Sequence, residues 1–109
     1  MWLAALGLIL GVVVGLVSPI TMPQAYVQYM SVAVLAAMDS VFGGIRAGME
    51  KKFDDMVFIT GFFSNTLLAA GLAYIGERLG VALITAAIFA FGVRIFQNLA
   101  IIRRHLLKK

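Results

Sequence analysis

Apolar residues fall in four long blocks along the chain, and short polar segments separate the blocks. The blocks cover about 2–17, 26–49, 56–75 and 81–102, and their apolar positions are nearly continuous rather than spaced at a helix or strand period. A helix without a polar face is suited to lipid as its solvent. The pattern therefore predicts an all-α, polytopic integral membrane protein, with four transmembrane helices in a single domain.

The segments between the blocks contain residues that end helices. Pro19 and Pro23 follow the first block, charged residues at 50–55 follow the second, and a hinge at 76–80 with a glycine at each end follows the third. As a helix the first block would be about 24 Å long, which is short for a hydrocarbon core of about 30 Å. The chain starts without a basic region or an evident small-residue cleavage site, so we expect a retained helix rather than a removed signal peptide.

Basic residues are distributed unevenly between the two predicted membrane faces. With the N-terminus inside, seven of them lie on the cytoplasmic side and only Arg78 lies outside. The seven are Arg46, Lys51, Lys52, Arg103, Arg104, Lys108 and Lys109. Because cytoplasmic loops carry an excess of Lys and Arg, we predict that both termini are cytoplasmic. Trp2 at the inner interface and the tyrosines at the outer one agree with this orientation, since aromatic rings favour both interfaces.

Composition agrees with a membrane protein and narrows the chemistry. Of 109 residues, 62% are hydrophobic and 13% are charged, whereas a soluble domain is about half apolar and about a quarter charged. The absence of cysteine excludes disulfides and thiolate chemistry. In a membrane protein the formal charge of +4 is first a topology signal, so we expect no nucleic-acid partner. We also expect no metal, other cofactor or enzymatic activity, because the sequence has no nucleophile–base pair, ligand cluster or cofactor motif.

Three of the predicted helices carry polar residues inside the membrane. Asp39 and Arg94 each lie about 13 residues from the outer start of their block, so both are predicted roughly 20 Å below the outer interface. Asn65 on the third block reaches a similar depth. Because polar residues are costly in lipid, these positions are candidates for function.

The candidate polar cluster comprises the ionisable and amide side chains of the last three blocks: Asp39, Arg46, Asn65, Arg94, Gln97 and Asn98. Their helical spacing places those of the second block on one face and those of the fourth on another. A polar face cannot point at lipid, so we expect both faces to point into the bundle or an oligomer interface. Two interpretations stay open. Asp39 and Arg94 form an ion pair that only stabilises the bundle, with Asn65 beside it, or the cluster lines an ion or proton path.

Glycines are also patterned. Gly7, Gly11 and Gly15 form a stripe of small residues on one face of the first block, which predicts close packing against a helix of this chain or of a second subunit. Gly43 and Gly44 in the second block would allow a close helix crossing or a local break.

Charged residues outside the blocks suggest weaker roles. The basic tail at 103–109 would contact anionic lipid headgroups or act only as a topology anchor. His105 has no metal-ligating partner at a useful spacing, so we assign it no role. The acidic residues at 50–55 alternate with lysines, which favours a solvated loop over a cation site.

The sequence resembles the bacterial small basic protein family, an uncharacterised membrane family of about this length, over nearly the whole chain. The segments that carry the resemblance are 1–3, 31–39, 43–46, 60–65, 89–98 and 101–104. The resemblance implies a plasma-membrane protein of Gram-positive-type bacteria, commonly encoded near cell-division and cell-wall genes. It also implies neighbouring genes for proteins with a single membrane helix and an extracytoplasmic domain.

A weaker similarity to small fluoride channels lies at 43–46 and 61–65. The Gly-Gly…Thr-Thr-Phe-Ser stretch of that family is absent from this chain, so its ion site is unsupported.

We therefore expect a non-enzymatic membrane scaffold or assembly partner of the bacterial cell envelope or division apparatus. Its expected partners are the lipid bilayer, a second copy in a homo-oligomer, and a single-span membrane protein with an extracytoplasmic domain. The alternative is a small ion channel or transporter lined by the polar faces of the second and fourth helices. Four thin helices rarely enclose a pathway alone, so this alternative requires an oligomer.

Overall fold

The structure, a computed structural model, describes residues 2–21 and 23–108 and forms four α-helices over that part of the chain. The helices are α1 Trp2–Val17, α2 Gln24–Met49, α3 Asp55–Leu79 and α4 Leu83–Leu107. The predicted all-α fold is confirmed. α2, α3 and α4 are long and apolar enough to cross a membrane, whereas α1 is a shorter apolar helix of 16 residues. That α1 also spans the membrane, and that both termini are cytoplasmic, stay predictions.

Two helices run further than the sequence pattern predicted. α4 continues to Leu107 instead of ending near 102, so most of the predicted tail is helical. Arg104 and His105 lie in its last turn, where positive charge is favourable beside the unsatisfied carbonyls. α3 continues to Leu79 instead of ending near 75, because the residue that ends it is Gly80 in the left-handed conformation, with φ of 70°.

The tight turn between α3 and α4 depends on glycine at two positions. Gly80 adopts the positive φ that other residues rarely do. At Gly76 the chain folds back so closely that an added Cβ would lie 2.5 Å from the Val81 carbonyl oxygen. The Val81 amide donates to the Gly76 carbonyl at 2.9 Å. Gly76, predicted as the first hinge residue, is therefore a buried residue of α3.

The connection between α2 and α3 is partly built by its own acidic residues. The Asp54 side chain accepts a hydrogen bond from the Val57 amide at 3.1 Å and so caps the start of α3. Glu50, at the end of α2, lies 3.6 Å from the Arg46 guanidinium one turn earlier. Two of the acidic residues in the predicted solvated loop therefore have local structural partners.

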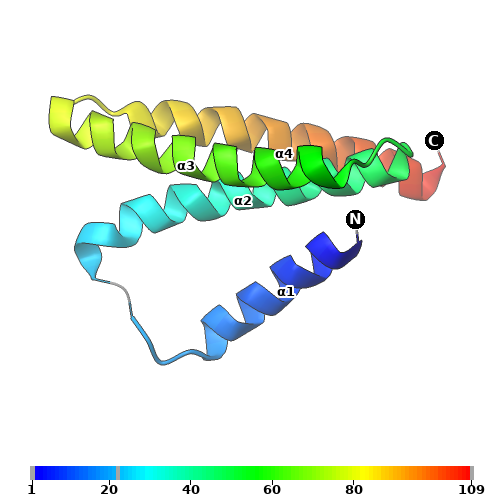
Figure 1. Ribbon diagram of the computed structural model, residues 1–109, viewed down its shortest axis with the longest axis horizontal. Helices are drawn as coiled ribbons and strands as arrows, with labels where there is room; N and C mark the ends of the chain where they lie inside the picture. The colour runs from blue at the N-terminus through cyan, green and yellow to red at the C-terminus, as the bar shows by residue number, and fades with distance from the viewer. Residues whose placement is uncertain (1, 22, 109) are drawn as a thin grey trace.

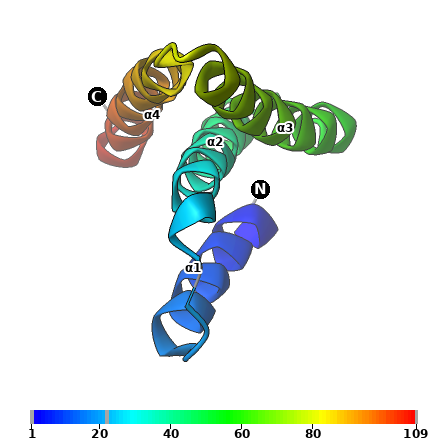
Figure 2. The ribbon, with the colours of Figure 1, turned by 90° about the vertical axis from the view of Figure 1, so that its left-hand side faces the viewer.

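α2 is the central helix, and each of the other three contacts it. α2, α3 and α4 lie along one another, whereas α1 leans away from them at an angle (Figure 1). Viewed from the end that carries the α3–α4 turn, α3 and α4 lie together near the turn and then diverge to opposite sides of α2 (Figure 2). α1 lies on the other side of α2.

The connected cluster of buried apolar residues lies in the half of the bundle next to the α3–α4 turn, which we call the turn half, and Val41 and Ile95 are buried beyond it. The buried residues of this cluster are mostly alanines and come in pairs from three helices: Val32 and Ala36, Ala69 and Ala73, and Ala87 and Phe91. The alanines let the helices approach closely there. At the outer end of the turn half, the Tyr29 hydroxyl donates to the Glu77 carboxylate and so links α2 to α3.

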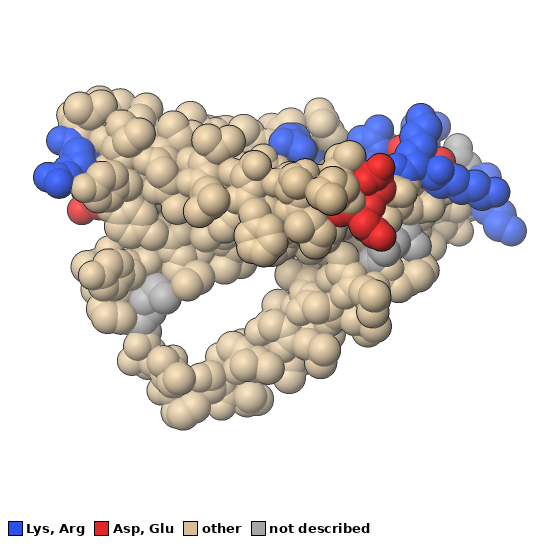
Figure 3. Space-filling model, in the orientation of Figure 1, with Lys and Arg blue, Asp and Glu red and all other residues tan. Residues whose placement is uncertain are grey.

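Charged side chains gather at the opposite end, which we call the basic end (Figure 3). This end holds the α2–α3 connection and the end of α4, whereas the turn end holds Arg78 and Glu77. Arg78 bonds the Tyr74 hydroxyl at 3.0 Å. Six of the seven basic residues assigned to one predicted membrane face therefore lie at one end of the bundle, and the seventh, Lys109, lies outside the described residues. Which side of the membrane that end faces stays a prediction.

Candidate functional site

Asp39 lies on α2 where the hydrophobic core ends. Its side chain is fully buried, at 0% exposure, and the Oδ2 atom lies 3.4 Å from Arg94 Nη2 on α4. The structure thus brings together the two charges that the sequence placed at one depth. The contact is asymmetric, because the Arg94 side chain is 56% exposed. Within the described part of the chain, neither carboxylate oxygen of Asp39 has a hydrogen-bond partner.

Asn65 does not complete the ion pair as expected. Its Nδ2 atom donates instead to the Ser40 hydroxyl, at 3.5 Å. Ser40 follows Asp39 on α2 and partly faces α3, so the amide reaches the neighbouring position rather than the carboxylate. Sequence reasoning did not single out Ser40. A serine in a helix can bond its own backbone, so its presence alone indicates no interhelical partner.

The remaining polar residues form a second group nearer the basic end. Arg46 Nη1 donates to Asn98 Oδ1 at 3.1 Å and joins α2 to α4. Asn98 is buried at 6% exposure, whereas Gln97 is exposed. The predicted polar face of α4 therefore consists of one buried amide, Asn98, and two exposed side chains, Arg94 and Gln97.

Both groups line one open region, which we call the polar cleft. It consists of two cavities that share Gly43, Ala47 and Arg94. The first, of about 270 Å³, is lined by α2, α3 and their connection, with Arg94 of α4, and reaches from Asp39 and Asn65 to Lys52 and Asp54. The second, of about 290 Å³, lies between α2 and α4. Its charged and amide lining residues are Arg46, Glu50, Arg94, Gln97 and Asn98.

Glycines on α2 set how closely its neighbours approach the cleft. A Cβ at Gly44 would lie 2.9 Å from two ring atoms of Phe58 on α3, and one at Gly43 would lie 3.7 Å from Asn98 Nδ2 on α4. Gly44 therefore provides a close crossing of α2 and α3, and α2 continues as a helix through it.

The glycine stripe of α1 has no such contact. A Cβ added at Gly7, Gly11 or Gly15 would meet nothing within 4 Å. Gly7 and Gly11 line an apolar groove of about 550 Å³, whose opposite wall includes Val41 of α2 and Phe62 of α3. No described helix packs closely on this stripe, so close packing against a second subunit stays a prediction.

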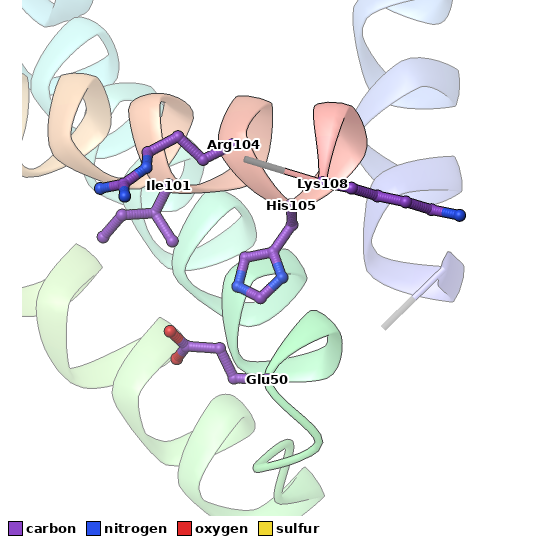
Figure 4. A pocket seen from close by; sticks show the side chains of 5 residues that line it. All are labelled: Glu50, Ile101, Arg104, His105 and Lys108. Atoms are coloured by element: carbon purple, nitrogen blue, oxygen red, sulfur yellow. The ribbon is translucent and has the colours of Figure 1, made fainter.

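A further cavity at the basic end brings together residues of the predicted basic tail and His105, to which the sequence assigned no role. Arg104, His105 and Lys108 line it from α4 and the residue that follows, and Glu50 lines it from the end of α2 (Figure 4). The described residues contain no group of three or more His, Cys, Asp or Glu side chains that could hold a metal ion. What the arrangement does offer is paired charges, amides and open polar space.

Comparisons with known proteins agree on the family and assign no activity. The family model described as "Protein of unknown function (DUF1290)" matches residues 22–107. The chain is 56% identical over 109 residues to the "Small basic protein" of Bacillus subtilis (strain 168). This alignment covers 100% of this chain and 90% of the Bacillus protein. The chain is 46% identical over 101 residues to uncharacterised proteins of Mycobacterium bovis and Mycobacterium tuberculosis, covering 91% of this chain and 84% of each relative.

No solved structure matches this chain. The family match includes all of α2, α3 and α4, and the Bacillus match covers the full length. The chain therefore belongs to the DUF1290 family of proteins of unknown function, in agreement with the resemblance to small basic proteins.

Proposed function

We propose that this protein is a non-enzymatic membrane scaffold or assembly partner, and that a partner protein occupies the polar cleft. One observation carries the proposal. The connected apolar cluster lies in the turn half of the bundle, while the other half holds the two cavities of the polar cleft, beside the buried Asp39 and the exposed Arg94.

Inside a membrane the solvent around the bundle is lipid rather than water. A carboxylate removed from water without hydrogen bonds is destabilised by several kcal/mol, and one ion contact offsets only part of that. Arg94 is more than half exposed on a helix of membrane-spanning length. An exposed guanidinium at such a position must reach water or a protein acceptor, because lipid tails offer neither. A partner that fills the cleft would bring acceptors to the exposed Arg94 guanidinium.

The proposed cellular location rests on the family resemblance rather than on the geometry of the structure. Genes of this family commonly lie near cell-division and cell-wall genes, which makes the bacterial plasma membrane and its envelope machinery the proposed location. Proteins with one membrane helix and an extracytoplasmic domain are the candidate partners.

Co-purification followed by mass spectrometry tests the scaffold proposal, and the chain offers a matched pair of variants. Gly61 of α3 lines the cleft, and a Cβ there would meet nothing within 4 Å. Gly61→Leu should therefore fill the cleft without disturbing the chain's own packing. Gly71→Leu is the control, because Gly71 lies on the same helix, has equally open space and does not line the cleft.

We expect the tagged wild-type protein and Gly71→Leu to retain one membrane protein after mild solubilisation, and Gly61→Leu to lose it. Equal recovery of the partner with both variants would show that it binds outside the polar cleft. Absence of any partner from the wild-type sample would reject the scaffold proposal.

The second candidate is an oligomeric channel or transporter. It is supported by the cavity that leads from the basic end to the buried Asp39, with Arg94 and Asn65 on its walls. In a single chain, the core around Ala36 and Phe91 closes the turn half, so a route across the membrane requires an oligomer. Ion flux into liposomes containing the purified protein, abolished by Asp39→Asn, would support this candidate. Liposomes that stay tight would reject it.

A further inference from the structure

The cavity at the basic end combines charges from two helices. Its volume is about 530 Å³, and its lining residues are Glu50, Ile101, Arg104, His105 and Lys108. Ile101, Arg104 and His105 are spaced at i, i+3 and i+4, which places them on one face of α4, and Lys108 follows the helix in the left-handed conformation. Figure 4 shows the His105 ring and the Glu50 side chain on opposite walls of the same space.

The charge balance of this cavity favours an anion. Arg104 and Lys108 bring two permanent positive charges, and Glu50 is its one acidic lining residue. The Glu50 carboxylate lies 3.6 Å from the Arg46 guanidinium, so part of its field is already neutralised. The end of α4 carries partial negative charge, so an anion here must be held by side chains rather than by backbone amides.

We propose that this cavity is a binding site for the phosphate group of an anionic phospholipid. An arginine fork matches two phosphate oxygens, and Lys108, which also lines the cavity, contributes a second positive charge. A basic pocket between membrane helices near the headgroup level is a recurrent form of lipid recognition. The inference does not depend on the scaffold proposal, because it uses a different cavity and a different ligand.

The position of the cavity favours lipid over a free anion. It lies at the end of three helices that are long and apolar enough to cross a membrane, which is the level of the headgroups. Ile101 lines the wall, and Leu106 and Leu107 are exposed on the same end of α4. These apolar side chains can pack against the glycerol backbone and the first acyl carbons of a phospholipid, which inorganic phosphate lacks.

The arrangement also differs from general attraction of a basic tail. Arg103 is adjacent to Arg104, carries the same charge and is exposed, but does not line the cavity. If the tail attracted lipid only by its overall charge, both arginines would contribute equally to lipid affinity. In a defined binding site, Arg104 and Lys108 contribute to the affinity and Arg103 contributes almost nothing.

The experiment is a titration of the purified full-length chain in neutral detergent with phosphatidylglycerol, followed by native mass spectrometry. Arg104→Gln and Lys108→Gln are each expected to weaken phosphatidylglycerol binding on the order of fivefold. Arg103→Gln should leave it nearly unchanged. Phosphatidylcholine should bind more weakly than phosphatidylglycerol to the wild-type chain, and inorganic phosphate should not displace the bound lipid at comparable concentration.

Each arm has an outcome that overturns the proposal. Equal losses for Arg103→Gln and Arg104→Gln would show general attraction by the tail. Equal binding of phosphatidylcholine and phosphatidylglycerol would remove the preference for an anionic headgroup. Displacement by inorganic phosphate would show that the ligand is a free anion. Circular dichroism of each variant confirms that the altered binding does not come from lost helix.

Discussion

The environments of Asp39 and Arg94 differ, although the two form one ion pair. The carboxylate is fully buried and the guanidinium is more than half exposed, with 3.4 Å between Oδ2 and Nη2. Loss of the arginine would leave a buried charge without compensation, whereas loss of the aspartate would leave a cation that still reaches the open cleft.

This asymmetry predicts unequal mutational effects. Arg94→Gln should lower the thermal unfolding temperature in detergent strongly, with a free-energy loss of roughly 3–5 kcal/mol. Asp39→Asn should lower it less, and the double variant should regain part of the loss, because no lone buried charge remains. Thermal unfolding of the four proteins measures the coupling. Strictly additive losses would contradict direct pairing and would strengthen the channel interpretation.

Part of this site could be predicted from sequence and part could not. Counting residues along each block gave the depths of Asp39 and Arg94, and the energy of a lone charge in lipid gave the reason to pair them. Depth does not fix how a helix is rotated about its axis. The bond from Asn65 to Ser40, and the separate group of Arg46 and Asn98, depend on that rotation and could not be derived.

At the scale of whole elements, glycine has a different role on different helices. On α2, Gly44 lies against the Phe58 ring, with Phe53 close behind it. On α3, Gly61 has open space where a side chain would be. The same residue type is thus a packing requirement at one position and an opening at another.

The contrast predicts which glycine tolerates a methyl group. Gly44→Ala should destabilise the bundle by about 1–3 kcal/mol, because its Cβ would lie 2.9 Å from the Phe58 ring and force that ring to move. Gly61→Ala should have no measurable effect on stability. Unfolding by a denaturing detergent compares the two variants. Equal stability of both would show that α2 and α3 do not cross closely at Gly44.

The glycine stripe of α1 leads to a prediction about assembly rather than folding. Because a Cβ at Gly11 would meet none of the described residues within 4 Å and would face an open apolar groove, Gly11→Leu should leave the helical content unchanged. If a second subunit packs on the stripe, the variant should weaken the oligomer much more than Leu8→Ala does. Chemical cross-linking in membranes measures the difference. Equal and mild effects of both variants would indicate that the stripe faces lipid.

Helix number and approximate bounds could be predicted because lipid solvation imposes long apolar blocks on the sequence. The predicted helix ends were less accurate than the predicted number of helices. A continuous apolar pattern stops marking a helix once basic residues begin, yet α4 runs on through Arg103 and Arg104. The sequence also did not indicate that α1 leans away from the other three helices, because a helix that is apolar all round can face either lipid or protein.

At the scale of the whole molecule, the charge distribution predicts the orientation. Reporter fusions after Asp55 and at Lys109 should read cytoplasmic, and fusions at Thr21 and Glu77 should read external, because basic residues accumulate on the cytoplasmic side. The Thr21 fusion also tests whether the 16-residue α1 crosses the membrane. An external signal at Lys109 would contradict the model with both ends inside.

The molecule as a whole is a bundle that is closed in its turn half and open in its other half. The closed half is built from alanines, a valine and a phenylalanine, and the open half combines charges, amides and glycines with apolar residues such as Phe58 and Phe62. A chain that only had to be stable in lipid would not need the second half to be polar. We therefore interpret the polar cleft as a surface that is completed by another protein.

Site-specific photo-cross-linking in living cells tests that interpretation most directly. A photoreactive amino acid replaces Gly61 in the cleft or, as the control, Gly71 on the same helix. The account predicts a protein adduct from position 61 that is absent at position 71, and the cross-linked protein should be the one that co-purifies with the wild-type chain. Identical adducts at both positions, or only lipid adducts at position 61, would contradict a partner in the cleft.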